Sequence, residues 1–419
     1  MKKSRITVAC ALAGALLLST GCGRDDSGGS ATPGVDTKAK TIKLGVLTAL
    51  SGPAEAIGAP LYAGNQAYFK WVNDHGGFGG YKVELEARDN KYDQQETITQ
   101  YGQIKDDVAA FAQVLGTSPV TAIQQDLKTD NIVASPATLD APWYADPQLV
   151  SFLPPYQIQA ISAIDYFINE MGGKGKNVCT INSSDSFGPA SLEGVKFGVK
   201  ALGVPLVDSE SFRTGDKDFS AQLVSLQKKK CDFVWVGAGT PEFVGILGQA
   251  AGRDFGPVWM SATYSTGLAA TELGPYLAKH FVASQVGVGW GDDSSEGMKN
   301  MLAAAKAYFP DQRPDPRFIM GWLEAQSVGD VIEKAVKDGD LTREGIRHAL
   351  DTVGELTFDG MLPDLPYGAP ADRQIGQGAS FFKVTPETLA TNGGLTLQGP
   401  EASIYASKAA AEFTIPGVG

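Results

Sequence analysis

The chain has 419 residues, of which 43% are hydrophobic and 20% charged, and its formal net charge is −12. This composition is typical of a globular protein that is long enough for two sizeable lobes, each with its own core. The acidic balance excludes nucleic acid as a partner, because a nucleic-acid-binding surface needs clustered basic residues.

The N-terminal stretch has the features of a secretory signal. A basic start is followed by the apolar residues 6–18, a segment too short to cross a bilayer of about 30 Å as a helix. Small residues at 19–21 precede Cys22, so the stretch resembles a bacterial lipobox, in which cleavage leaves the cysteine as a lipid-bearing N-terminus. An ordinary signal peptide cleaved nearby and a retained membrane anchor are the alternatives. We therefore expect a signal peptide at 1–21, a lipid on Cys22, and a flexible tether at 22–40, which is too polar to build a core.

Strands and helices alternate in the first part of the chain. Apolar and alternating patterns predict, in order, a strand at 41–50, a helix around 61–72, a strand at 81–89, a helix around 98–111, and short buried strands at 114–118 and 131–135. This order predicts a parallel sheet that is covered by helices on both faces.

The same alternation begins again further along the chain. Strands are expected at 177–182, 205–212, 231–239 and 257–262, with helices between them. The chain thus has two similar α/β units in tandem, at about 42–155 and 156–285. Helices around 294–308 and 316–337 follow. The part from about 355 is rich in Gly and Pro and can be placed only loosely.

Small residues and hydroxyls follow three strands of the first unit, at 50–53, 116–118 and 135–138. Ligands of open parallel sheets bind just beyond the carboxyl ends of the strands. Backbone N–H groups and hydroxyls that converge there suit a carboxylate or another compact anion. The alternative for any one of these clusters is that its Ser or Thr only caps its own helix.

A carboxylate and an aromatic ring follow strands of the second unit. Glu242 comes after the strand at 231–239 and could accept hydrogen bonds from a ligand ammonium. Its alternative role is to complement the dipole of the helix that begins there. Phe187 comes after the strand at 177–182 and would either close over a ligand or anchor the core.

Seven stretches occur in the order in which one known family has them. They cover most of residues 42–340 and read IKLGVLTALSGPAEAIG, GGFGGYKVELEARDNKYD, VLGTS, IVASPAT, SSDSFG, GDKDFSAQLVSLQKKKCDFVWVGAGTPEFVGILGQA and FIMGW. Together they resemble the leucine/isoleucine/valine-binding family, which are solute-binding proteins of ABC importers for branched-chain amino acids. The resemblance implies a type I periplasmic-binding fold, an α/β fold with two Rossmann-like lobes whose parallel-sheet cores are joined by a multi-strand hinge.

This fold suggests how the chain is divided. Lobe 1 is expected at 41–155 plus about 288–340, and lobe 2 at 156–287 plus part of 341–385. The tail at 386–419 is left without a predicted place.

The candidate ligand-binding residues share a position after a strand, and they are Ser51, Thr117, Ser118, Ala137, Thr138, Phe187, Glu242 and Tyr264. The resemblance implies that the groups at 117–118 and 137–138 bind the α-carboxylate of an amino acid. It also implies that Glu242 binds the α-ammonium and that Phe187 supplies an aromatic contact. Two departures from the family affect the side-chain pocket. Phe187 is usually Tyr, and an aromatic residue often found at the position of Ile57 is absent.

Cys179 and Cys231 are expected on neighbouring strands of the second unit. The other two cysteines lie in the signal and at its cleavage site, so these two remain in an oxidising compartment. In the doubly wound strand order 2-1-3, the strand of Cys179 lies beside the strand that Cys231 opens, about 5 Å away and within disulfide reach. We expect a disulfide, and two unpaired core thiols are the alternative. A first-lobe disulfide of some relatives would fall at Tyr92 and Gly116 and cannot form here.

The sequence lacks the motifs of an enzyme or a metal protein. We find no G-x-S-x-G elbow, no H-E-x-x-H spacing and no Walker A or G-x-G-x-x-G motif after a strand, so we expect no catalysis, no metal and no cofactor. The predicted function is a monomeric receptor, anchored to the cell membrane by a lipid on Cys22. It binds a small amino acid, branched-chain or otherwise aliphatic, and delivers it to ABC permease subunits. The alternatives are a receptor of the same fold for an amide, a urea-like solute or an aromatic acid, and a ligand sensor for a signalling partner.

Overall fold

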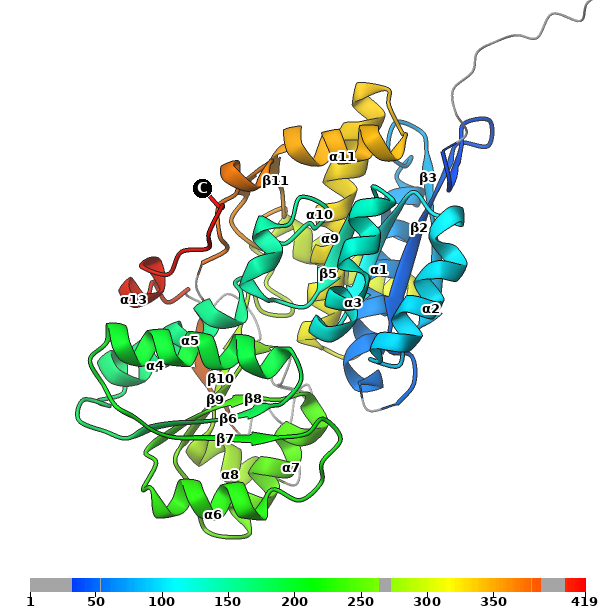
Figure 1. Ribbon diagram of the computed structural model, residues 1–419. Coiled ribbons are helices and arrows are strands. Elements are labelled where there is room, and N and C mark those ends of the chain that lie inside the picture. Colours follow the sequence, from blue (N-terminus) through cyan, green and yellow to red (C-terminus); the bar gives the residue numbers. More distant parts are fainter. Residues whose placement is uncertain (1–31, 53, 264–272, 378, 386–403) are drawn as a thin grey trace, which may run out of the picture. The chain divides into compact units, whose positions relative to one another are not determined.

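The computed structural model describes residues 32–52, 54–263, 273–377, 379–385 and 404–419. Within these residues, two parallel sheets with flanking helices form two lobes, which confirms the expected fold class (Figure 1). None of the described helices is long and apolar enough to cross a membrane.

Lobe 1 is built on a parallel sheet with the strand order β3-β2-β4-β5, and the short β1 pairs antiparallel with the start of β2. The strands are β1 (Val35–Asp36), β2 (Thr41–Thr48), β3 (Lys82–Asp89), β4 (Ala110–Leu115) and β5 (Ala134–Ala137). One face is covered by α1 (Glu55–Asp74) and α10 (Pro316–Asp338), with α9 (Glu296–Tyr308) beside α1, and the other by α2 (Gln94–Ile104) and α3 (Thr117–Thr129). Because both faces are covered, β4 and β5 are buried at every position.

Helices α1 and α10 pack closely because each has a glycine where they meet. A Cβ on Gly64 would lie 2.2 Å from the carbonyl oxygen of Phe318, and a Cβ on Gly321 would lie 2.0 Å from that of Leu61. The side chain of Asn65 also donates a hydrogen bond of 2.8 Å to the carbonyl of Gly321. The core of lobe 1 is therefore completed by a helix that comes after the whole of lobe 2 in the sequence.

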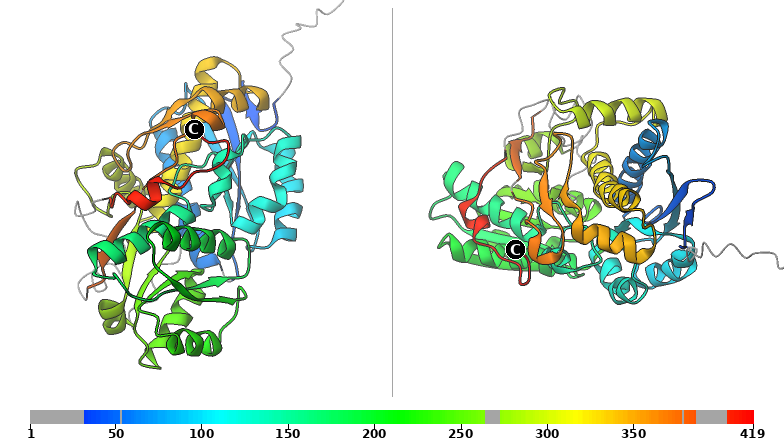
Figure 2. Two further views of the ribbon diagram at one scale, coloured as in Figure 1. Left: turned by 60° about the vertical axis from the view of Figure 1, so that its left-hand side comes forward. Right: turned by 90° about the horizontal axis from the view of Figure 1, so that it is seen from above.

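Lobe 2 repeats the same plan, with the parallel strand order β7-β6-β8-β9. Its strands are β6 (Val178–Ser183), β7 (Leu206–Phe212), β8 (Phe233–Gly237) and β9 (Val258–Ser261). Helices α4 (Tyr156–Glu170) and α5 (Phe187–Ala201) cover one face, and α6 (Ser220–Lys228), α7 (Thr240–Ala251) and α8 (Gly274–His280) cover the other (Figure 2). Both sheets follow the doubly wound order 2-1-3-4, so the carboxyl ends of their strands are the places to look for a site.

The stretch 341–385 is divided between the two lobes. Helix α11 (Arg343–Thr352) packs on α10, and the strands β11 (Gly354–Leu356) and β12 (Leu365–Tyr367) form a hairpin followed by the short η4 (Pro370–Asp372). Arg373 is fully buried, and its guanidinium donates to the carbonyl oxygens of Tyr144, Asp146 and Leu149, which fixes this segment to lobe 1. Only β13 (Ser380–Lys383) pairs with a lobe 2 strand, β10 (Val282–Gln285).

The end of the chain, residues 404–419, covers helix α4. Its short helix α13 (Lys408–Ala411) lies beside α4, and Ser407 Oγ donates a 2.5 Å hydrogen bond to Asp165 Oδ2. Phe413 is buried, with its ring centroid 5.2 Å from that of Phe197 on α5. The same apolar cluster includes Tyr144. This part of the tail, for which the sequence predicted no place, is therefore packed against the protein.

The expected helix around 98–111 and the strand at 114–118 are wrong at their boundaries. Helix α2 ends at Ile104, and the short η1 (Lys105–Asp107) separates it from β4. Phe111 lies in β4, where its N–H donates to the carbonyl of Val133. Its side chain fits a helical spacing by coincidence, because a strand with both faces buried is apolar at every position. The strand predicted at 114–118 extends too far, because Thr117 is already the first residue of α3.

Candidate functional site

A cavity of about 190 Å³ is lined by residues that follow the strands of both sheets. Lobe 1 and the start of α4 contribute Ala54, Ile57, Tyr92, Gly116, Ala137 and Tyr156. Lobe 2 contributes Ser183, Asp185, Phe187, Thr214, Gly239 and Glu242. Three of the predicted ligand-binding residues are thus among those that line it, namely Ala137, Phe187 and Glu242.

Glu242 lies in the first turn of α7 and is 4% exposed. Its Oε1 accepts a hydrogen bond of 2.8 Å from the N–H of Gly215, and its Oε2 accepts none from the described residues. Glu242 also lines the cavity, so its second carboxylate oxygen is available to a donor that enters there. A bond from a ligand donor and a favourable interaction with the dipole of α7 are both consistent with this position.

Asp185 is a second carboxylate of the cavity that the sequence analysis did not single out. Its Oδ1 accepts from Ser183 Oγ at 2.6 Å and from the N–H of Phe187 at 3.1 Å, and its Oδ2 accepts from Thr214 Oγ1 at 3.0 Å. Thr214 and Gly215 are adjacent in one turn. Thr214 donates to Asp185 and Gly215 donates to Glu242, so this turn connects the two carboxylates. Asp185 lies in the stretch SSDSFG, directly after the strand at 177–182. This position after a strand was the sequence signal that could have identified it as a cavity residue.

Phe187 and Tyr156 form an aromatic wall of the cavity. Their ring centroids are 4.4 Å apart and the rings are tilted by 55°. Phe187 is 6% exposed, so it is both a buried anchor and part of the cavity lining. Burial raises the pKa of the Tyr156 hydroxyl, which is hydrogen-bonded to Thr138 Oγ1 at 3.2 Å. The hydroxyl therefore stays protonated at neutral pH.

Four predicted hydroxyl residues have protein partners in the structure. Thr117 Oγ1 and Thr138 Oγ1 lie 2.6 Å apart and are buried, and neither residue lines the cavity. Ser118 Oγ donates to Ser186 Oγ, and Ser51 Oγ donates to Asp89 Oδ2 at 2.6 Å. These hydroxyls are bonded within the protein, and at the same strand ends Gly116 and Ala137 line the cavity instead. The remaining candidate, Tyr264, lies outside the described residues, as does Cys22.

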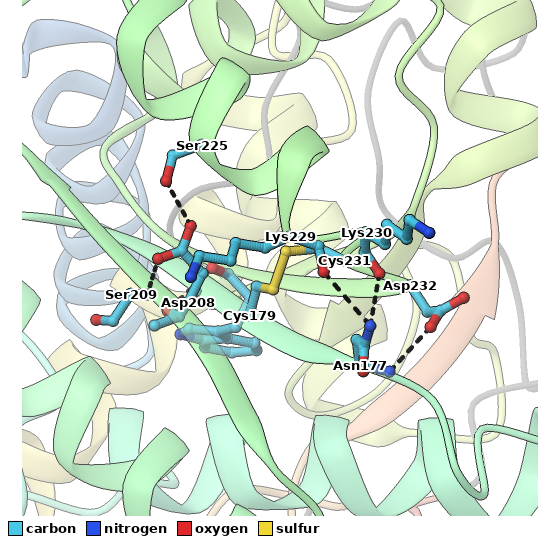
Figure 3. Close-up of a disulfide and its surroundings, with 11 residues drawn as sticks. Asn177, Cys179, Asp208, Ser209, Ser225, Lys229, Lys230, Cys231 and Asp232 are labelled. Carbon is cyan, nitrogen blue, oxygen red and sulfur yellow. Dashed lines mark hydrogen bonds between the residues drawn. A yellow bond between two sulfur atoms is a disulfide. The ribbon is translucent and has the colours of Figure 1, made fainter.

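The two cysteines of lobe 2 are joined by a disulfide, Cys179–Cys231, with a Cα–Cα distance of 5.8 Å. Cys179 lies in β6, and Cys231 lies just before β8, the neighbouring strand. Asn177 supports the same junction: its side chain donates to the carbonyl of Lys230, and its N–H donates to Asp232 (Figure 3). The disulfide therefore joins β6 to the segment that leads into β8, and neither cysteine lines the cavity.

Among the described residues, no group of three or more His, Cys, Asp or Glu side chains is placed to hold a metal ion. The cavity has carboxylates, the ammonium of Lys91, the hydroxyl residues Ser183 and Thr214, aromatic rings and apolar side chains to offer a ligand. This donor set suits the capture of a small organic solute.

Comparison with known proteins places these features in context. Residues 41–392 match the family described as periplasmic binding protein. The Leu/Ile/Val-binding protein of Escherichia coli strain K12 is 23% identical over 350 residues, which are 79% of this chain and 90% of that protein. The Leu/Ile/Val-binding protein BraC3 of Rhizobium johnstonii is 27% identical over 205 residues, and the match spans 48% of this chain and about half, 55%, of that relative.

A solved structure has the same fold. It is titled a fatty acid ABC transporter substrate-binding protein from Thermomonospora curvata, and it superposes with a TM-score of 0.83 at 24% identity, covering 92% of this chain and 97% of the other.

Proposed function

Because this chain belongs to the periplasmic binding protein family, we propose that it is the extracytoplasmic receptor of an ABC importer and that it binds a small aliphatic amino acid between its two lobes. The relatives in this family that it matches are named as binding proteins and not as enzymes. In the proposal, the lobes close over the amino acid by a hinge motion and present it to the permease subunits.

The observation that carries the proposal is the pairing of Glu242 with an apolar wall in one small cavity. The unoccupied Oε2 of Glu242 would accept hydrogen bonds from the α-ammonium, as charge-assisted bonds that are stronger than neutral ones. Ile57 and Leu115 would pack against an aliphatic side chain. The backbone at Gly116, which precedes α3, would face the α-carboxylate, because helix N-termini favour anions.

The size and charge of the cavity distinguish this ligand from others. At about 190 Å³ the cavity is below the roughly 300–1,000 Å³ of pockets for drug-sized molecules, which favours a small solute. Three carboxylates line it, those of Asp93, Asp185 and Glu242. Against the single ammonium of Lys91 they leave a negative balance, which disfavours an anion without an ammonium group, such as a fatty acid. Amides, urea-like solutes and aromatic acids are the alternative ligands, and a sensor for a signalling partner is the alternative role.

The proposal also includes the location of the protein. The tether expected at 22–40 is shorter than that, because Gly34 accepts a hydrogen bond from the N–H of Lys43 and β1 pairs with β2. A lipid on Cys22 would anchor the chain, and the polar residues before 32 would let the lobes move near the membrane. The receptor would act as a monomer, because each chain has both lobes that line the cavity.

The proposal is tested by the melting temperature of the mature protein in the presence of candidate ligands. The protein is first unfolded and refolded to remove ligand carried over from expression. Leucine, isoleucine and valine are compared with other amino acids, with urea and short amides, with aromatic acids and with a medium-chain fatty acid. A ligand at 100 times its dissociation constant adds about 2.7 kcal/mol of stability. A shift with the aliphatic amino acids is expected, and a shift only with compounds that lack an ammonium group would overturn the assignment of Glu242.

A further inference from the structure

Tyr92 lies in the loop between β3 and α2, and its side chain lines the cavity. The ring lies over Gly116: a Cβ on that glycine would be only 2.8 Å from Cε2 of Tyr92. Gly116 also has a φ of +109°, which favours glycine. The absence of a side chain at Gly116 leaves the space that the Tyr92 ring occupies. The Tyr92 ring therefore occupies part of the volume next to the α3 N-terminus.

The loop that carries Tyr92 has an unusual backbone. Lys91 and Tyr92 follow one another with φ values of +51° and +60°, in the left-handed region that residues with a side chain seldom adopt. Two such residues in succession persist only when the surrounding structure holds them. Because Lys91 and Tyr92 line the cavity, we interpret the conformation of this loop as one that positions the Tyr92 side chain.

Two side chains at the end of β3 hold this loop. Asn90 is fully buried; its Oδ1 accepts from the N–H of Tyr92 at 3.0 Å, and its Nδ2 donates to the carbonyl of Leu115 at 3.0 Å. Asp89 Oδ1 accepts from the N–H groups of Leu50 and Lys91 at 2.9 and 3.0 Å. The loops after β2, β3 and β4 are thus tied together beneath the Tyr92 ring.

Tyr92 is half-buried, and its ring also packs against the large apolar core cluster. Its hydroxyl makes no hydrogen bond to any described residue, although burial and the nearby charges of Asp185 and Glu242 raise its pKa. No described residue therefore fixes the ring through its hydroxyl. The ring contributes a wall of the cavity, opposite residues of lobe 2 such as Phe187 and Glu242.

From these observations we infer that Tyr92 is a specificity-determining residue, whose ring limits the volume that the cavity offers to a ligand. This inference rests on the proposed function, since it concerns the same cavity. Asn90 is then a positioning residue, which acts on the ligand only through the place it gives Tyr92. Neither residue was among the sequence-based candidates.

The test measures the dissociation constants of leucine and phenylalanine by calorimetry for the wild type, Tyr92→Ala and Tyr92→Phe. Removing the ring is expected to change the ratio of the two constants at least tenfold in favour of phenylalanine. Tyr92→Phe keeps the ring and is expected to keep the ratio within about twofold. Tyr62→Ala, a tyrosine of α1 that does not line the cavity, is the matched control.

The outcomes separate this inference from the proposed function. A folded Tyr92→Ala protein that binds leucine with an unchanged ratio overturns the inference alone. Wild type that binds neither amino acid overturns the proposed function and the inference with it. If Tyr92→Ala fails to fold, Tyr92→Asn is measured in its place, since asparagine also lacks the ring and tolerates a left-handed backbone, and a shift toward phenylalanine is again required.

Discussion

The hydroxyl of Ser118 lies 3.0 Å from that of Ser186, and the two residues belong to different lobes. Ser118 is in the first turn of α3, and Ser186 is the residue that precedes α5. The N–H of Ser186 also donates to Ser118 Oγ at 3.3 Å. Two helix N-termini, one from each lobe, are thus connected beside the cavity through one serine side chain. Ser118 was expected to contact the ligand, and its place in the structure suggests instead a contact that forms when the lobes are together.

Ser118→Ala should therefore weaken ligand binding without changing which ligand is preferred. A hydrogen bond contributes about 0.5–1.5 kcal/mol, so the dissociation constant should rise roughly two- to tenfold. Small-angle scattering of the ligand-free variant should show a larger radius of gyration than the wild type. Ser184→Ala, an exposed neighbour of Ser186, is the control and should leave both measurements unchanged. An unaltered affinity in Ser118→Ala would mean that the contact does not contribute to closure.

Glu242→Gln should weaken amino-acid binding by tenfold or more. Glutamine keeps an oxygen that can accept from Gly215, so the fold is retained, but it removes the negative charge that would meet the ammonium. Calorimetry with leucine measures the effect, and Glu296→Gln, on an exposed carboxylate of α9, serves as the control. Equal affinity in the variant and the wild type would rule out a role for Glu242 in ammonium binding.

Loss of the Cys179–Cys231 disulfide should destabilise lobe 2. The bond closes a loop with a sequence separation of 52, and chain-entropy arguments give a contribution of about 4 kcal/mol. Urea unfolding of the wild type should shift to lower urea when a reductant is added. A Cys179→Ala, Cys231→Ala double variant should already be destabilised and should not respond to the reductant. No shift in the wild type would show that the two cysteines are unpaired in solution.

Asp330 on α10 should make the stability of the fold depend on pH. Burial raises the pKa of this carboxyl to about 7, although hydrogen bonds from Thr357 oppose the shift, and the neighbouring charges of Glu333 and Asp359 add to it. Between about pH 4 and pH 7 the folded protein keeps a proton that the unfolded chain has released, so this group lowers stability as the pH rises.

Asp330→Asn removes this titration. Relative to the wild type, the variant should be about equally stable at pH 4 and more stable at pH 8, by on the order of 1 kcal/mol or more. Urea unfolding at pH 4, 5.5 and 8 measures the difference, with the exposed Asp311→Asn as the control. Parallel stability curves for Asp330→Asn and the wild type would contradict the assigned shift.

Cys22→Ser tests the proposed membrane anchor. Serine cannot receive the thioether-linked lipid, and a polar tether alone has no affinity for a bilayer, so the protein should appear in the medium instead of the membrane fraction. Cell fractionation with an antibody against the mature protein gives the answer. Retention of the variant in the membrane fraction would mean that another segment anchors the chain.

Much of the fold follows from the sequence, because its signals are local. The strands from β2 to β9 were expected close to their observed places, since most are short apolar runs between helical patterns, and β3 has an alternating pattern. The errors in element boundaries came where tertiary contacts determine the secondary structure. Strand β4 pairs with β2 and β5, so Phe111 lies in a strand although its spacing suggests a helix. The packing of the tail on α4 depends on contacts such as Ser407 with Asp165, which no local pattern predicts.

The site was predictable in its location but less so in its chemistry. The rule that ligands bind after parallel strands led to Ala137, Phe187 and Glu242, which line the cavity. Whether a hydroxyl faces a ligand or a neighbour depends on the loops across from it, so the mutual bond of Thr117 and Thr138 could not be foreseen. Tyr92 was missed for a related reason, since its position is set by backbone conformations that the stretch NKYD does not reveal.

The packing of α1 against α10 has a consequence for how the protein is made. Residues 156–285 hold the whole parallel sheet of lobe 2, so this sheet can form as soon as that part of the chain has emerged, although β13 and residues 404–419 join the lobe later. Lobe 1 cannot, because Gly64 and Leu61 on α1 have no helix to pack against until Gly321 and its neighbours are available. During that interval the apolar face of α1 is exposed, and it is the part of the nascent chain that most needs protection from aggregation. The parallel sheet of lobe 2 can therefore form before lobe 1 is complete, and the site between the lobes can form only after α10 has been added.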